Sequence, residues 1–303
     1  MNTLSENYIV VGIGELLWDM LPSGKRAGGA PVNFAFHASQ RGAYGCAISA
    51  VGRDPLGDAL LKELDRYNIN HLVQTVDHPT GTVEVALDAG VPQYIIHENV
   101  AWDYLSSTKE MEDLARQADV ICVGTLAQRN SLTRQTTQAL LRLAPDAAYK
   151  LYDINLRQQY YSREIIEETL RHVNSFKVND DEIRLLKDMF ALTGSDEDAC
   201  RWFMEKYGLK LVIFTAGHRY STVYTADQTS TIPTPTVDVV DTVGAGDSFS
   251  GVLVTELLKG AALADAHATA VQIAAEVCAH AGAWVYHPDV NASAMAPLRS
   301  KEM

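Results

Sequence analysis

The chain has 303 residues, of which 47% are hydrophobic and 21% charged, so it can bury a large core. Its formal net charge of −13 argues against a nucleic-acid binder, because such proteins need clustered Lys and Arg to displace counterions. No apolar run reaches the roughly 20 residues of a membrane span, and the first residues lack the basic flank of a signal peptide. We therefore expect a soluble, cytoplasmic protein with no nucleic-acid or membrane partner.

The first third of the chain alternates strand and helix patterns, with one interruption. We expect strands at residues 8–13 and 47–52 and helices at 32–41 and 55–67. Residues 71–98 differ, because runs of β-branched residues are separated there by HPTG and AGVP turns. This pattern predicts hairpins that stand off the main body.

The alternation then continues along the rest of the chain. Strands are expected at 120–125, 150–155, 176–179, 211–217 and 221–226, and helices at 131–143, 163–172, 180–188, 196–207, 247–258 and 263–281. Strands separated by helices imply a largely parallel sheet covered on both faces. The sequence therefore predicts one large α/β domain.

The four cysteines are far apart and mostly lie in apolar surroundings. They are Cys46, Cys122, Cys200 and Cys278. Because no CxxC or Cys/His metal spacing exists among them, we interpret them as buried thiols of a reducing compartment.

Two common nucleotide-binding patterns are absent. Gly12-Ile13-Gly14 follows a strand and begins like GxGxxG, but Leu17 occupies the place of the third glycine. Gly24-Lys25 is followed by an arginine and lacks the upstream glycine of a P-loop. The sequence therefore favours neither a dinucleotide-binding domain nor a P-loop protein.

The stretch DTVGAGDSFSGVL, residues 241–253, places two glycines directly before a predicted helix. If Gly244 and Gly246 lie where a loop becomes a helix, unpaired amides there form an anion site, and glycine lets a phosphate approach the backbone. Asp247 has two interpretations: a helix cap, or a base that takes the proton of an attacking hydroxyl beside a held phosphoryl group.

This stretch resembles the C-terminal signature D-T-x-G-A-G-D of ribokinase-like (PfkB) carbohydrate kinases. Further matches follow in family order along almost the whole chain. They are Gly28-Gly29-Ala30-Pro31-Val32-Asn33, the V-G-x-D-x-x-G of residues 51–57, the N-x-x-E of Asn179 to Glu182, and Thr215-Ala216-Gly217, which begins T-x-G-x-x-G. Tyr220 stands where that last motif usually has its second glycine.

The resemblance implies a three-layer ribokinase-like fold, with a mostly parallel central sheet flanked by helices and a small β-sheet lid. Residues 1–15, 30–70 and 100–303 would form the core that binds nucleotide and sugar. Residues 16–29 and 71–99 would form the lid, whose closure over the sugar would exclude water. Lids of this family often pair between two subunits, so the resemblance also suggests a homodimer through the lid.

The resemblance also implies roles for single residues. Asp247 would be the catalytic base, with Gly244, Ala245 and Gly246 as the anion hole. The sugar would contact Asp19, Gly28, Gly29 and Asn33 in addition to Asp247. Arg157, in a D-x-N-x-R stretch that begins at Asp153, would face the sugar or the phosphates, although a surface salt bridge explains it equally well.

ATP and Mg²⁺ are the implied donor and metal. The nucleotide would contact Asn179, Thr215, Gly217, Gly244, Gly246, Cys278 and Gly282. Asn179 and Glu182 would hold Mg²⁺ through water, as hard oxygen ligands can, although a helix start with an acidic first turn also explains both residues. Asp241 resembles the ligand of a monovalent cation, usually K⁺, that many but not all members bind.

The stretches IGELLWDMLPSG, GGAPVN and YDINLRQQYYS resemble fructokinases more than ribokinases or nucleoside kinases. We therefore predict ATP-dependent phosphorylation of a sugar primary hydroxyl, with D-fructose giving fructose 6-phosphate. Lys25 and Arg26 keep a sugar phosphate open, and Arg157 or Arg129 would suit the carboxylate of 2-keto-3-deoxygluconate. Ribokinase-type activity and a non-catalytic sugar sensor are further alternatives.

Overall fold

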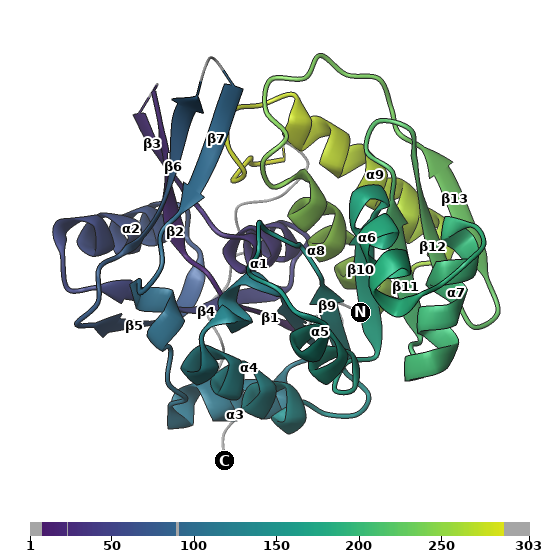
Figure 1. Ribbon diagram of the computed structural model, residues 1–303, viewed down its shortest axis with the longest axis horizontal. Coiled ribbons are helices and arrows are strands. Elements are labelled where there is room, and N and C mark those ends of the chain that lie inside the picture. The colour runs from purple at the N-terminus through teal and green to yellow at the C-terminus, as the bar shows by residue number, and fades with distance from the viewer. Residues whose placement is uncertain (1–7, 23, 89–90, 288–303) are drawn as a thin grey trace, which may run out of the picture.

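The computed structural model describes residues 8–22, 24–88 and 91–287, and its centre is a nine-stranded sheet (Figure 1). The strand order is β13-β12-β11-β10-β9-β8-β1-β4-β5. The strands are β1 (Ile9–Ile13), β4 (Tyr44–Gly52), β5 (Asn70–Val76), β8 (Val120–Val123), β9 (Tyr149–Asp153), β10 (Ser175–Asn179), β11 (Leu211–Thr215), β12 (Tyr220–Thr225) and β13 (Thr229–Pro233). All neighbours from β11 to β5 run parallel, and β12 and β13 add an antiparallel edge.

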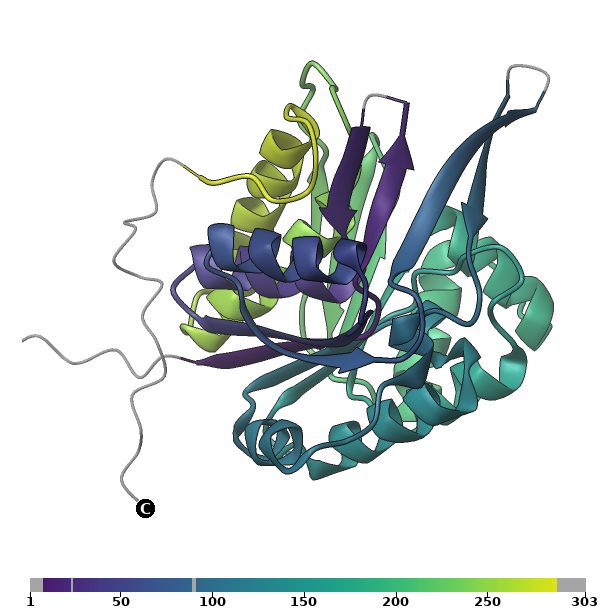
Figure 2. The same ribbon diagram turned by 90° about the vertical axis from the view of Figure 1, so that its left-hand side faces the viewer.

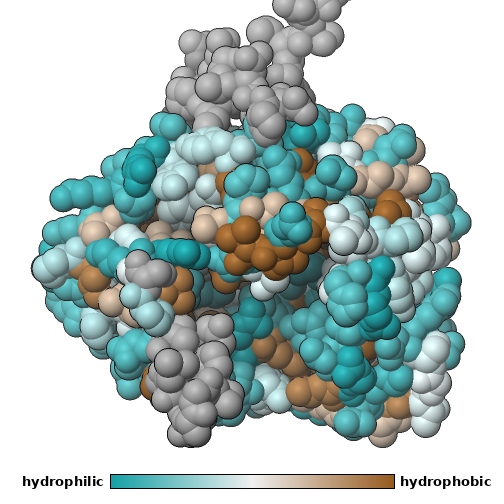
Figure 3. Space-filling view, turned by 90° about the horizontal axis from the view of Figure 1, so that it is seen from above, coloured by the Kyte–Doolittle hydropathy of each residue, from teal (hydrophilic) through white to brown (hydrophobic). Residues whose placement is uncertain are grey.

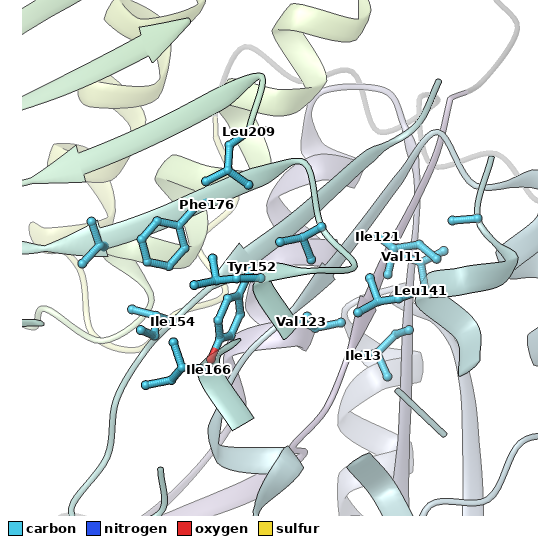
Figure 4. Packing of buried hydrophobic residues seen from close by; sticks show 14 of the residues in the cluster. Val11, Ile13, Ile121, Val123, Leu141, Tyr152, Ile154, Ile166, Phe176 and Leu209 are labelled. Carbon is cyan, nitrogen blue, oxygen red and sulfur yellow. The ribbon is translucent and has the colours of Figure 1, made fainter. Parts of the chain in front are cut away.

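Helices cover both faces of this sheet. The helices are α1 (Ala30–Gln40), α2 (Pro55–Arg66), α3 (Lys109–Gln117), α4 (Ser131–Leu143), α5 (Arg163–Leu170), α6 (Asp180–Phe190), α7 (Asp196–Tyr207), α8 (Ala245–Leu258) and α9 (Leu263–Cys278). One buried cluster packs the five helices from α3 through α7 against one face of the sheet. It includes Tyr152, Ile166 and Phe176 (Figure 4). A second cluster joins α1, α8 and α9 to the opposite face. This arrangement confirms the predicted three-layer α/β class.

Local sequence explains where the helices begin, as α2 illustrates. Asp54 precedes the helix in an extended conformation, and its carboxylate accepts a hydrogen bond from the Gly57 amide at 2.8 Å. Pro55 occupies the first turn, where a missing N–H costs nothing. Leu60 and Leu64, four residues apart, are fully buried on the inner face.

A separate four-stranded sheet stands beside the main body (Figure 2). Its order is β3-β2-β6-β7, formed by β2 (Leu17–Leu21), β3 (Gly24–Gly28), β6 (Gly81–Asp88) and β7 (Val91–Ile96). We refer to it as the lid sheet. Its strands come from the two segments that the sequence assigned to a lid.

The sequence analysis was wrong about several elements: it did not expect strand β13, and three further elements differ as follows. Residues 71–76, expected in the lid, lie in β5, because this strand pairs in parallel with β4 at the edge of the central sheet. Helix α3 was not expected, since its nine residues, with a strongly polar outer face, give a short pattern. Helix α9 ends at Cys278, before the expected residue 281.

Parts of the expected core and lid, residues 1–7, 23, 89–90 and 288–303, lie outside the described residues. In the part of the chain that the structure covers, no helix is long and apolar enough to cross a membrane.

Candidate active site

Polar side chains converge where three central strands end and three helices begin. Glu15 follows β1, Asp153 ends β9, and Asn179 ends β10. Helix α1 starts beside them and carries Asn33, and α8 carries Asp247 in its first turn. The carboxyl edge of a parallel sheet is where open α/β folds bind ligands. This cluster, beneath the lid sheet, is the candidate active site.

Helix α8 begins with amides that are available to an anion. Gly244 is the N-terminal cap residue, with a left-handed φ of 80°, and no side chain caps the helix. Within the described residues, the amides of Gly244, Gly246 and Asp247 make no hydrogen bond, whereas the Ala245 amide donates to the Thr242 carbonyl at 3.3 Å. Of the three amides in the predicted anion hole, those of Gly244 and Gly246 are therefore free and that of Ala245 is already bonded, while the Asp247 amide adds a further free donor.

The two glycines of this turn are required for a reason that sequence reasoning did not give. A β-carbon on Gly244 would lie 2.4 Å from Cβ of Ala283, and one on Gly246 would lie 3.0 Å from Nζ of Lys177. Neighbouring protein atoms therefore occupy the space on both sides of the turn. The glycines make room for Ala283 and Lys177, and their role in the approach of a phosphate stays a prediction.

Asp247 does not cap its helix. Its Oδ2 accepts a hydrogen bond from Asn33 Nδ2 at 2.8 Å, and Asn33 Oδ1 accepts one from Trp284 Nε1 at 2.8 Å. Burial, followed by the neighbouring Asp153 carboxylate, raises the pKa of Asp247 to about 7, although Lys177 and Asn33 oppose the rise. A carboxyl group with a pKa near neutrality suits a general base.

Lys177 is a site residue that the sequence analysis missed. Its ammonium lies 2.6 Å from Asp153 Oδ2, and Ser250 Oγ donates to the same oxygen at 3.4 Å. The lysine is almost fully buried in β10, whose sequence is SFKVN. A charged residue within a buried strand needs a buried partner, and that signal could have identified it.

Glu15 was missed as well. It is 4% exposed, and its Oε2 has no hydrogen-bond partner among the described residues. Burial raises the pKa of Glu15, and the nearby guanidinium groups of Arg157 and Arg129 oppose that rise. An unpartnered buried carboxylate oxygen is costly unless a ligand or ion satisfies it.

The predicted sugar contacts lie together at the base of the lid sheet. Asp19 in β2 and Gly28 in β3 are neighbours, because a β-carbon on Gly28 would lie 3.1 Å from Asp19 Oδ2. Gly29 begins α1 with a φ of 134° and lies against the Glu15 carbonyl. Burial, followed by the charge of Asp241, raises the pKa of Asp19 to about 6.

Arg157 makes no ion pair within the described residues, so the surface salt bridge considered for it is not formed. Its Nη1 donates to the Leu156 carbonyl at 3.0 Å, and the side chain is exposed. Its charge lowers the pKa of both Glu15 and Asp19, so the guanidinium lies toward the site.

Asn179 and Glu182 form a reciprocal cap at the start of α6. Asn179 Oδ1 accepts from the Glu182 amide at 2.9 Å, and Glu182 Oε2 accepts from the Asn179 amide at 2.8 Å. Glu182 Oε1 also accepts from the Leu156 amide at 2.9 Å. The helix-start interpretation is therefore correct for both residues, and their role at Mg²⁺ stays a prediction.

The predicted nucleotide contacts lie on both sides of the loop before α8. Thr215 ends β11, and the Gly217 carbonyl accepts a hydrogen bond from Thr234 Oγ1 at 2.8 Å. On the other side, the Cys278 carbonyl accepts from the Asp241 amide at 3.2 Å. Exposed valines of this loop are Val239, Val240 and Val243. The surface seen from the end of the molecule where the lid sheet stands carries apolar groups among hydrophilic ones (Figure 3).

Asp241, the predicted K⁺ ligand, is paired with a side chain of the lid sheet. Its Oδ2 lies 2.7 Å from Arg26 Nη1 and also accepts from the Gly282 amide at 3.1 Å. Its Oδ1 accepts from the Val243 amide at 3.1 Å. The arginine of β3 thus connects the lid sheet to the loop that leads into α8.

Comparison with known proteins gives a family. A sequence model of the pfkB family of carbohydrate kinases matches residues 23–288. The chain is 30% identical to fructokinase-2 of Zea mays over 277 residues, which cover 84% of this chain and 81% of that protein. It is 27% identical to an ATP-dependent 6-phosphofructokinase of Thermoanaerobacterium thermosaccharolyticum over 310 residues, 94% of this chain and 92% of that protein.

A solved structure agrees in fold. The crystal structure of an uncharacterised sugar kinase from Pyrococcus horikoshii in complex with ATP superimposes with a TM-score of 0.72 at 25% identity, over 90% of this chain and 93% of that one. The central sheet with helices on both faces and the separate lid sheet agree with the fold of that structure. The chain belongs to the pfkB family of carbohydrate kinases.

Proposed function

We propose that this protein transfers the γ-phosphoryl group of ATP to the primary hydroxyl of D-fructose, giving fructose 6-phosphate and ADP. The observation that carries the proposal is Asp247, a buried carboxyl with a pKa of about 7 in the first turn of α8, beside the free amides of Gly244 and Gly246. The relative from Zea mays, named a fructokinase, supports the sugar.

The chemistry assigned to these groups is an in-line displacement. Asp247 accepts the proton of the sugar hydroxyl. The oxygen of that hydroxyl forms a bond to the γ-phosphorus while the bond between the γ-phosphorus and the ADP oxygen breaks. The amides at the start of α8 stabilise the negative charge on the transferring phosphoryl oxygens. Lys177, beneath Gly246, adds positive charge to the same turn.

The residues present suit a divalent cation held through water. Asp153, Glu182 and Asp247 place three carboxyl groups near one ammonium, that of Lys177, and Glu15 adds a fourth near Asp247. In the described part of the chain, no three His, Cys, Asp or Glu side chains are arranged to hold a metal directly. Mg²⁺ would neutralise the phosphates, with Asn179 and Glu182 beside its water shell.

A neutral hexose fits the sugar side better than a sugar phosphate does. Lys25, one of the two basic residues considered for a phosphate, lies over the Trp18 ring at 4.2 Å, and Arg26 is paired with Asp241. Asp19 and Asn33 offer an acceptor and an amide to hydroxyl groups.

An acid sugar such as 2-keto-3-deoxygluconate is the second candidate. Arg129 is bound to both carboxylate oxygens of Asp103 at 2.8 Å, so its charge is already compensated. Arg157 faces the site without an ion pair among the described residues and would suit a carboxylate. A sugar sensor without catalysis is disfavoured, because Asp247 and both glycines of the turn are present.

The test is ADP release from Mg·ATP with fructose, ribose, glucose, 2-keto-3-deoxygluconate, adenosine and fructose 6-phosphate as acceptors. We expect turnover with fructose, and Asp247→Ala should lose at least about 10²-fold in kcat. Turnover with another acceptor would retain the mechanism and reject the sugar. Activity that survives in Asp247→Ala would reject the mechanism, and no turnover with any acceptor would reject the fructokinase proposal.

A further inference from the structure

The segment that follows α9 packs against the turn at Gly244 where α8 begins. Ala283 lies directly against Gly244, because a β-carbon there would be 2.4 Å from Ala283 Cβ. The next residue, Trp284, donates to Asn33, which in turn bonds to Asp247. The position of two consecutive residues therefore affects both the anion hole and the base.

Two buried histidines fasten this segment to the core. His37 of α1, which is fully buried, places Nε2 at 2.8 Å from the Ala283 carbonyl oxygen. Its Nδ1 lies 3.3 Å from Nε2 of His287, and His287 Nδ1 lies 3.3 Å from Oε2 of Glu276 in α9. These three contacts form one continuous hydrogen-bonding chain from Glu276 through His287 and His37 to Ala283.

The number of protons in this chain follows from its end groups. A carbonyl oxygen only accepts, so His37 must carry its proton on Nε2 and accept on Nδ1. His287 must then donate from Nε2 to His37. A neutral His287 would therefore turn the lone pair of Nδ1 toward the lone pairs of the Glu276 carboxylate. Three contacts need three protons, and two neutral imidazoles supply only two.

All three contacts are hydrogen bonds only while His287 carries a second N–H, on the Nδ1 that faces Glu276. Burial holds the pKa of His37 at about 3, so that ring stays neutral. Burial also lowers the pKa of His287, although Glu276 opposes it, while Arg41 and His280 add to the lowering. The Arg41 guanidinium, from the end of α1, is itself bound to Glu256 of α8 at 2.7 Å, and His280 Nδ1 bonds to the Glu276 carbonyl at 2.9 Å.

We propose that His37 and His287 are positioning residues for phosphoryl transfer, and that the proton shared by His287 and Glu276 determines how firmly Ala283 and Trp284 are held. Its kinetic consequence rests on the proposed kinase function, whereas the proton count does not. All three hydrogen bonds between Glu276 and Ala283 are formed while the third proton is bound. As the pH rises through the lowered pKa of His287, below about 6.5, one of the three hydrogen bonds is lost.

Glu276→Gln is the sharpest variant, because a side-chain amide donates to Nδ1 of neutral His287 and completes the chain without the third proton. The ratio of kcat in Glu276→Gln to kcat in the wild type cancels the titration of Asp247. We expect that ratio to be about 1 at pH values below the lowered pKa of His287 and to rise to about 3 or more at pH 8, which is a fraction of what one lost buried hydrogen bond costs. A ratio that stays flat across this range overturns the positioning role.

His287→Ala and His287→Gln separate positioning from simple loss of structure. His287→Ala removes the donor to His37 and should lower kcat about tenfold with the KM for the sugar unchanged. His287→Gln restores an N–H donor and should recover most of kcat. His71→Gln is the matched control, because His71 also faces a carboxylate, Asp65 at 3.6 Å, but at the sheet edge. Equal losses in all three variants contradict the proposal.

Nuclear magnetic resonance of the full chain with ¹⁵N-labelled histidine tests the proton count without reference to catalysis. We expect His37 to be protonated on Nε2 from pH 5 to 8, and His287 to gain a second N–H as the pH falls, a step that Glu276→Gln removes. A His37 protonated on Nδ1, or a His287 that stays unchanged, overturns the inference. Because this readout needs no substrate, its failure is distinguishable from failure of the kinase proposal.

Discussion

At the scale of single residues, Asp247 would face two opposing demands in its proposed role as the base. A base must lose its proton to act, but burial beside Asp153 favours the protonated carboxyl. Lys177 and the amide of Asn33 pull in the other direction, and the balance places the pKa at about 7. A fully paired aspartate would be a weaker base, and an unopposed buried one would stay protonated.

This balance predicts opposite pH effects on rate and on stability. The rate constant kcat/KM should rise as the pH increases through about 7, because only the carboxylate accepts a proton. The folded state holds this proton up to pH 7 whereas the unfolded chain loses it near 3.8, so folding is weakened as the pH rises between these values. Asp247→Asn should therefore raise Tm by about 2 °C or more at pH 8 and leave it unchanged near pH 4. Equal Tm differences at both pH values, measured by calorimetry, contradict this.

Lys177 should be needed for both stability and rate. Lys177→Met leaves the Asp153 carboxylate buried and unpaired, which we expect to cost about 3–5 kcal/mol in urea unfolding. The double variant with Asp153→Asn should recover most of that stability but not the activity, since the positive charge beneath Gly246 stays absent. Full activity in the double variant would mean that the lysine is structural only.

At the scale of the element, the start of α8 is shaped by its neighbours as much as by its own sequence. Gly244 and Gly260 flank the same helix with nearly equal left-handed φ values, 80° and 84°. A β-carbon on Gly244 would collide with Ala283, but one on Gly260 would meet no atom within 4 Å. The two positions therefore have the same backbone requirement and different surroundings.

This pair provides a matched test of the anion hole. Gly244→Ala and Gly260→Ala should each lose about 1–2 kcal/mol from the left-handed backbone. Only Gly244→Ala must also displace Ala283, so its kcat should fall at least about tenfold in the ADP-release assay while Gly260→Ala stays near wild type. Similar kcat values in both variants would show that the turn tolerates displacement.

At the scale of the whole molecule, the ion pair of Arg26 with Asp241 connects the lid sheet to the loop that precedes α8. The guanidinium supplies positive charge where the family resemblance places K⁺. We therefore expect little activation by K⁺ in the wild type and more in Arg26→Ala, compared as KCl against tetramethylammonium chloride. Arg53→Ala, which removes an exposed pair with Asp77, is the control. Strong K⁺ activation in the wild type would show that the arginine does not replace the cation.

The lid sheet also carries the predicted dimer contact. Met20 of β2 and Ile95 of β7 are 37% and 43% exposed. We expect light scattering after size exclusion to give twice the 33.2 kDa of one chain, and Ile95→Lys to shift the mass toward a single chain. A single-chain mass for the wild type at high concentration would reject the dimer.

Much of the fold was predictable from sequence. Helices α4 and α7 have the expected limits, because a buried stripe at helical spacing and a capping residue, Asn130 or Ser195, mark them locally. Strand β5 was misplaced because β-branched alternation does not state which sheet a strand joins. Pairing with β4 decided that, through contacts more than 20 residues apart in the chain.

For the site, the sequence by itself determined the residues with a local pattern: the turn at Gly244, Asp247, and the cap of Asn179 with Glu182. Only the tertiary structure decided what surrounds them. Lys177 and Glu15 are surrounded by apolar residues in the sequence, and only folding places Lys177 against Asp153 and Glu15 near Asp247. The physical reason is that a hydrogen-bonded turn is specified by adjacent residues, whereas burial, pKa and charge balance depend on atoms that the chain brings together from distant strands.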